Sequence, residues 1–180
     1  ARGDRDAEET PQDQRDHLTA HAQGSTMVGI GADRAARQGG HVTSQVFVNL
    51  TTRDLARSQT FYEALGCTIN PQFSDENAIC VIWSDEIYFM MLLPEFFDSF
   101  GGKPIADPAQ FTQVRTAFSR DSKYAVDAIV DAALAHGGAL TGETQDLGFM
   151  YGRAVEDPDG NILEFFYMDM EAAAAGMEAA

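Results

Sequence analysis

Residues 156–166 of this 180-residue chain read EDPDGNILEFF. Pro158 and Gly160 within DPDG are typical of a tight turn, because proline presets one backbone angle and glycine accepts a positive φ. The apolar residues of 161–168 (NILEFFYM) then predict a strand. Glu164 lies inside that strand, where an unpaired carboxylate would be costly to bury. We therefore expect Glu164 to have either a charged partner or a function.

Outward from this turn, the chain shows the same order of predicted elements twice. Alternating apolar residues predict strands, and apolar residues three or four positions apart predict helices. The first half predicts a strand at 43–50, a helix between Asp54 and Gly66, and strands at 67–73, 78–84 and 86–93. The second half predicts a strand at 112–119, a helix between Asp121 and Gly137, and strands at 139–144, 149–156 and 161–168. Each half therefore has the order βαβββ.

Composition sets the domain organisation and excludes several classes of partner. Residues 1–41 lack aromatic side chains and predict a disordered tail, 42–169 a single domain, and 170–180 a C-terminal tail. The domain divides into module one (44–93), a connector (94–111) and module two (112–169). A formal charge of −16 argues against nucleic acid and membrane partners. No apolar run is long enough to span a bilayer, so a cytoplasmic location is expected.

Two motifs carry a resemblance to a known family. The stretch RDLARSQTFYEALG (53–66), followed by EDPDGNILEFF, resembles the vicinal oxygen chelate superfamily of glyoxalases, bleomycin-resistance proteins and extradiol dioxygenases. FVNL (47–50), NPQF (70–73) and GFMYGR (148–153) make it similar to lactoylglutathione-lyase-related proteins within that superfamily. The resemblance implies an α+β fold in which two βαβββ modules form a cupped, incomplete mixed β-barrel with helices on the outside.

The resemblance also implies four positions that hold a divalent cation in the metal-dependent members. They fall on Phe47, on Met90 or Met91, on Arg115 give or take one residue, and on Glu164. Hard divalent cations require several converging nitrogen or oxygen donors, and only Glu164 supplies one. We therefore expect no metal and no other cofactor.

Glu164 and Arg115 are instead expected to line the cup together. They either form a structural ion pair or serve a ligand, with Glu164 as the candidate catalytic base. The candidate ligand-binding residues are Phe47, Asn49, Met91, Arg115, Tyr151 and Arg153. Tyr151 and Arg153 have the alternative of a solvated strand face or an edge salt bridge.

The favoured function is binding of a small organic molecule in the cup without a metal, as in bleomycin-resistance proteins. One alternative is a metal-dependent enzyme, either a lyase or isomerase of the glyoxalase type or a dioxygenase-like one. Another is a dimeric interaction protein whose cup is vestigial. A homodimer is expected by analogy with the superfamily.

Overall fold

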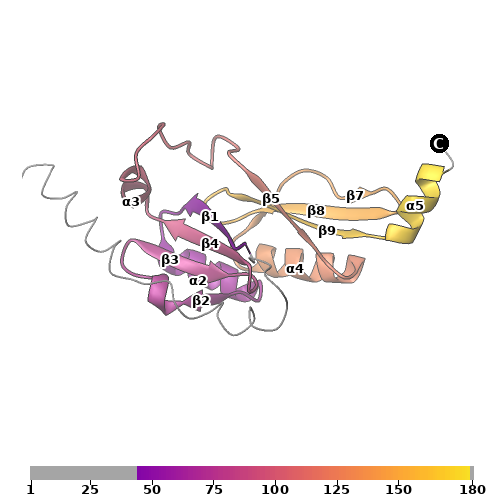
Figure 1. The fold of residues 1–180 in the computed structure, drawn as a ribbon, viewed down its shortest axis with the longest axis horizontal. Helices are drawn as coiled ribbons and strands as arrows, with labels where there is room; N and C mark the ends of the chain where they lie inside the picture. The colour runs from indigo at the N-terminus through magenta and orange to yellow at the C-terminus, as the bar shows by residue number, and fades with distance from the viewer. Residues whose placement is uncertain (1–43, 179–180) are drawn as a thin grey trace, which may run out of the picture. The chain divides into compact units, whose positions relative to one another are not determined.

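The computed structural model describes residues 44–178 (Figure 1), so the tail predicted at 1–41 lies outside the described residues. The described chain is an α+β fold with two mixed sheets that do not close into a barrel. Helices α2 and α4 each follow the first strand of a sheet. None of the described helices is both long enough and apolar enough to cross a membrane.

The first sheet has the strand order β1-β4-β3-β2. Its strands are β1 (Val46–Thr51), β2 (Thr68–Asn70), β3 (Ala78–Ile82) and β4 (Ile87–Leu92). β1 runs parallel to β4, and the other neighbours are antiparallel. β2 is shorter than predicted because Pro71 begins a 3-10 helix, η2 (Pro71–Phe73). β1 therefore forms one outer edge of this sheet.

The second sheet repeats this arrangement with the order β5-β9-β8-β6. Its strands are β5 (Arg115–Ser119), β6 (Ala139–Leu140), β7 (Gln145–Asp146), β8 (Met150–Glu156) and β9 (Ile162–Met168). β5 runs parallel to β9, and β7 pairs with β8 beside β6. Only the first two residues of the strand predicted at 139–144 form a strand, because Gly142 has a φ of +72°, and β7 begins just after the predicted range.

The helices begin and end at recognisable residues. α2 (Leu55–Ala64) begins after Asp54, whose side chain accepts a hydrogen bond from the Arg57 N–H, as predicted. α4 (Lys123–Ala135) begins after Ser122, whose side chain accepts a hydrogen bond from the Ala125 N–H. The connector contains a short helix, α3 (Pro94–Asp98), and residues expected to form a tail include α5 (Met170–Glu178).

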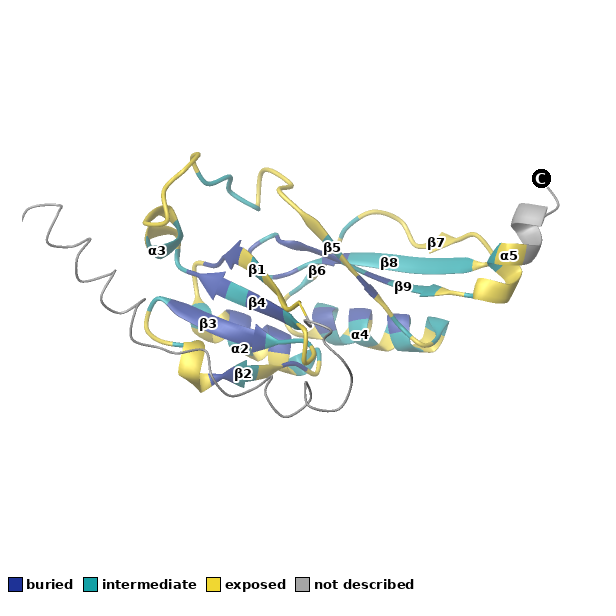
Figure 2. Cartoon of the chain, viewed as in Figure 1, coloured by how far each residue is buried: buried dark blue, intermediate teal, exposed yellow. Residues whose placement is uncertain are grey.

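Side chains from both halves share one hydrophobic core, visible as buried segments in Figure 2. Trp83 lies at the centre of the aromatic part of this core. Its ring stacks on Phe118 at a centroid distance of 4.3 Å and meets Phe89 edge-on at 5.6 Å. The stacked pair joins β5 to the end of β3, so the two sheets are held together by packing as well as by the chain.

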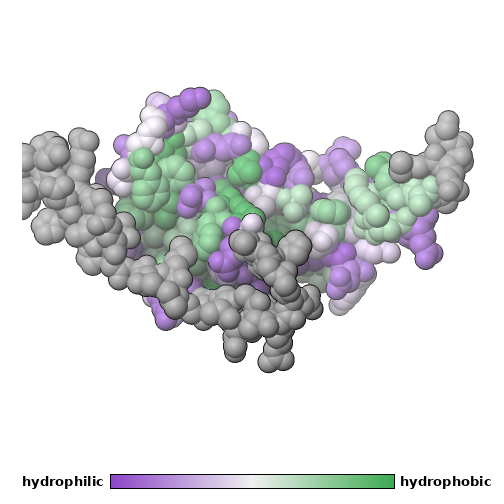
Figure 3. Space-filling model, viewed as in Figure 1, coloured by the Kyte–Doolittle hydropathy of each residue, from purple (hydrophilic) through white to green (hydrophobic). Residues whose placement is uncertain are grey.

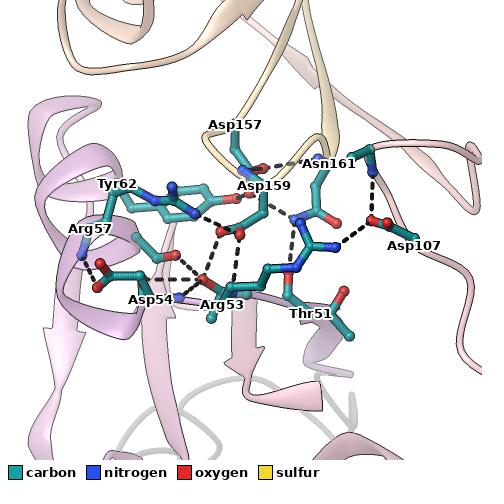
Figure 4. Close-up of polar contacts among 12 residues, drawn as sticks. Thr51, Arg53, Asp54, Arg57, Tyr62, Asp107, Asp157, Asp159 and Asn161 are labelled. Carbon is teal, nitrogen blue, oxygen red and sulfur yellow. Dashed lines mark hydrogen bonds and ion pairs between the residues drawn. The ribbon is translucent and has the colours of Figure 1, made fainter.

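The DPDG turn adds a polar junction between the halves (Figure 4). Asp159 is buried and accepts hydrogen bonds from Thr52 Oγ1 at 2.7 Å, the Arg53 N–H at 3.1 Å and Arg57 Nη2 at 2.7 Å. Asp157, also buried, accepts one from the Tyr62 hydroxyl at 2.9 Å. The turn of module two is thereby fixed to the β1–α2 corner of module one.

Burial raises the pKa values of two side chains in this junction, Tyr62 and Asp157. The pKa of Tyr62 lies well above its ordinary value because the ring is fully buried, and the Asp157 charge adds to the effect. Burial also raises the pKa of the Asp157 carboxyl, although hydrogen bonds, chiefly from Asn161, oppose that change. The buried Asp157 carboxylate accepts four hydrogen bonds, so its removal would leave four donors without that acceptor and would lower the stability of the fold.

Candidate functional site

Glu164 has the partner predicted for it. Arg115 Nε donates a hydrogen bond to Glu164 Oε1 at 2.5 Å, and the side chains are 48% and 34% exposed. The pair spans β5 and β9, where Ala117 lies opposite Glu164 in the parallel register. Glu164 was expected inside an apolar strand, and one third of its side chain is exposed to solvent. The pair therefore lies on the open face of the second sheet, away from α4.

Phe47 and Asn49 lie on the face of the first sheet opposite to the core. Phe47 stacks on Tyr88 of β4 at 4.7 Å, and Asn49 lies beside Met90 in the β1–β4 register. Met91 points the other way and is fully buried in the core. Of the two methionines that the sequence left open, Met90 is the one on the open face, and Met91 is corrected to a core residue because neighbouring strand residues face opposite sides.

Tyr151 and Arg153 do not share a face with Glu164. Both point toward α4, where the Tyr151 hydroxyl donates to Asp127 Oδ1 at 2.8 Å and Arg153 Nη1 donates to the same oxygen at 2.8 Å. Glu164 lies opposite Ala154, on the other face of β8. The Tyr151 hydrogen bond, with help from Arg153, holds the pKa of Asp127 below its ordinary value. Tyr151 and Arg153 therefore bind α4, and the prediction that they line the cup was wrong.

The residues at the four superfamily metal positions do not fit a divalent cation. Phe47 offers no donor, Met90 offers a soft thioether, and Arg115 is a permanent cation. Glu164, the remaining position, already accepts the Arg115 hydrogen bond. Within residues 44–178, moreover, no group of three His, Cys, Asp or Glu side chains is placed to hold a metal ion.

A pocket of about 220 Å³ lies between the outer edge of β1 and the connector. Residues 48–51 form one wall, residues 112–114 and 160–162 form another, and Phe97 and Phe111 of the connector add aromatic surface. Figure 3 shows hydrophobic surface around α3, β1 and β4, broken by hydrophilic residues, and Phe47 and Phe111 are among the exposed apolar side chains. Val114 and Ile162 line the pocket, so Arg115 and Glu164 lie just beyond it in sequence.

The sequence pointed to only one residue of this pocket, Asn49. Phe97 and Phe111 belong to the connector predicted at 94–111, which held no candidate ligand-binding residue, and Gln113 was not a candidate either. The signal available was weak, because these residues belong to a segment without periodicity. Gly160 was the better marker: a Cβ there would lie 2.8 Å from the Pro108 carbonyl oxygen, so glycine lets the connector lie against the DPDG turn.

Part of the chain matches the model of a known protein family. The family model described as bleomycin resistance protein-like N-terminal matches residues 45–82, which include β1, α2 and β3. A comparison with curated proteins gives no match.

Solved structures share the fold. A hypothetical protein from S. aureus has 25% sequence identity and a TM-score of 0.59, with 71% of this chain and 95% of that chain covered. A glyoxalase/bleomycin resistance protein/dioxygenase family enzyme from Burkholderia phytofirmans PsJN has 19% identity and a TM-score of 0.57, covering 68% and 96%. A glyoxalase/bleomycin resistance protein from Albidiferax ferrireducens T118 has 25% identity and a TM-score of 0.50, covering 67% and 95%. The matched family model and these shared folds make the chain similar to the glyoxalase and bleomycin-resistance proteins of the vicinal oxygen chelate superfamily.

Proposed function

We propose that this chain is a glyoxalase- and bleomycin-resistance-like protein that binds a small organic molecule without a metal, in the pocket beside β1. The observation that carries the proposal is the pocket itself, which Phe97, Phe111 and Asn49 line together. Apolar walls with a few polar groups are what small-molecule sites require.

The arrangement of the helices supports a cup. α2 packs against β3 and β4, and α4 packs against β8 and β9, so each helix covers one face of its sheet. The opposite faces carry Asn49 in one sheet and Glu164 in the other. In our proposal these open faces form the concave side of the cup. The pocket lies beside β1, the outer edge strand of the first sheet.

The Arg115–Glu164 pair has a supporting role in this proposal. Each charge is satisfied by the other at 2.5 Å, and neither residue lines the pocket. To act as a base, Glu164 would first have to break its ion pair with Arg115. The residues at the other three superfamily positions do not suit a metal ion that could polarise a substrate carbonyl. We therefore favour binding over lyase or isomerase chemistry.

Phe111→Ala tests the site. The Phe111 side chain is 60% exposed, so its removal leaves the core intact while opening one wall of the pocket. Tyr124→Ala, which removes an 82% exposed aromatic ring from α4, is the matched control. Thermal-shift screening with a library of small organic compounds should yield ligands that stabilise the native protein and Tyr124→Ala alike. The same ligands should lose most of their effect on Phe111→Ala. Ligands that stabilise all three proteins equally would refute the placement of the site.

A further inference from the structure

The pocket meets β1 along its edge rather than on one face. Four consecutive residues, 48–51, line it. Successive side chains of a strand point to opposite faces, so a pocket on one face would meet only every second residue. Contact with all four indicates that the pocket runs beside the backbone at the outer edge of the sheet.

Hydrogen bonds at both ends of β1 determine which backbone groups face this edge. The Val46 N–H donates to the Glu86 carbonyl at 2.7 Å, and the Thr52 N–H donates to the Leu92 carbonyl at 2.9 Å. Both bonds point toward β4. Because backbone groups alternate in direction along a strand, those of residues 47, 49 and 51 point away from β4, toward the pocket side.

One of these edge groups already has a partner. The Thr51 carbonyl accepts a hydrogen bond from Asn161 Nδ2 at 3.1 Å. The same alternation turns the backbone N–H and C=O of Asn49 away from β4, and none of the hydrogen bonds that the described residues make outside their helices and sheets engages either group. The pocket wall therefore presents a backbone donor and a backbone acceptor side by side on one residue, as an edge strand presents them to a further strand.

The charge of the lining restricts the ligand further. None of the described residues that form the pocket carries a charged side chain. A charged ligand would lose hydration there without gaining an opposite charge. Phe97 and Phe111 offer aromatic faces for a flat apolar group.

We propose that the pocket selects small, uncharged ligands that carry a primary amide or lactam next to a flat apolar group. The amide carbonyl accepts the Asn49 N–H, and the amide N–H donates to the Asn49 carbonyl. This inference rests on the proposed function, and it adds the ligand class to it.

Three nearly isosteric probes test the selection on the full chain: benzamide, benzoate and acetophenone. Benzoate replaces the amide nitrogen by a charged oxygen, and acetophenone replaces it by a methyl group. Titration followed by ¹⁵N–¹H NMR should show benzamide binding about tenfold more tightly than either analogue, which is the effect of roughly one buried hydrogen bond. The amide resonances of Asn49 and Thr51 should move most. Equal affinity for all three probes would overturn the inference.

Two substitutions at one position separate backbone from side chain. Asn49→Ala keeps the backbone N–H and should retain most of the preference for benzamide over acetophenone. Asn49→Pro removes the N–H, and proline is tolerated at an outer edge because that N–H does not bond to β4. It should abolish the preference. An unchanged preference in a folded Asn49→Pro variant would refute backbone recognition.

The two failures are distinguishable. If Phe111→Ala leaves binding of every probe unchanged, the pocket is not the site, and the proposed function fails. If Phe111→Ala weakens all three probes equally and none is preferred in the native protein, the pocket is the site but amide selection is refuted.

Discussion

Asp157 should contribute more to stability than any exposed turn carboxylate, and Asp157→Ala measures that contribution. Asp157 as a whole residue is only 3% exposed to solvent. Oδ1 accepts from the backbone N–H groups of Asp159 and Asn161, both at 2.9 Å. Oδ2 accepts from the Tyr62 hydroxyl and from Asn161 Nδ2, also both at 2.9 Å. Alanine would leave all four donors without this acceptor.

The magnitude follows from two opposing effects. Hydrogen bonds to a charged acceptor are each worth about 1.5 to 3 kcal/mol net, so four give roughly 6 to 12 kcal/mol as an upper limit. Against this, removing Asp157 recovers the cost of burying a carboxylate, a cost visible in its raised pKa. We expect the free energy of unfolding to fall by about 3 to 5 kcal/mol, because each buried donor left without an acceptor costs about 1 to 3 kcal/mol and the recovered burial cost offsets part of that sum.

Urea denaturation followed by fluorescence is the assay, because Trp83 is the single tryptophan of the chain and lies between the two halves. Asp75→Ala is the matched control. Asp75 is also a turn carboxylate and accepts from the Asn77 N–H at 2.7 Å, but it is exposed, so its loss should cost about 1 kcal/mol. If Asp157→Ala costs no more than Asp75→Ala, the burial argument is wrong.

Two further predictions concern titrating groups. Burial raises the pKa of Cys67 to about 12 and also raises that of Cys80, so neither thiol should react with a thiol reagent at pH 8 in the native protein. Both should react in denaturant, and rapid native-state labelling would contradict this. Because the pKa of Asp127 is lowered, its stabilising effect is present above the unfolded pKa of about 3.9 and is lost as pH falls through the lower folded value. Urea midpoints of the native protein should therefore fall more steeply than those of Asp127→Asn below about pH 4, and parallel curves would refute the assignment.

The order of elements was predictable because hydrophobic periodicity is a local property. Period-two and period-3.6 patterns located both sheets and the two long helices, and Asp54 marked the start of α2. The pairing of Arg115 with Glu164 was predicted from the superfamily positions together with this alternation, and the ion pair is observed.

The choice of face could not be predicted, because alternation separates two faces without saying which one a helix covers. Tyr151 and Arg153 looked like open-face residues until Asp127, 24 residues before Tyr151, was seen to bind both. The Met90 or Met91 ambiguity had the same origin. The pocket was missed for another reason: it depends on the path of a connector without periodicity and on the free backbone edge of a strand, which no side-chain pattern records.

The connector between the two halves is not what holds them together. Residues 98–104 are exposed, whereas the DPDG turn bonds to the β1–α2 corner and Trp83 stacks on Phe118. A chain cut in this stretch would therefore leave two fragments that remain associated, each supplying partners that the other lacks. Kept apart, the first fragment would hold Tyr62 without its acceptor and the second would hold Asp157 without its hydroxyl donor. The protein is thus suited to being divided here into two complementing pieces, whose reunion would restore the pocket.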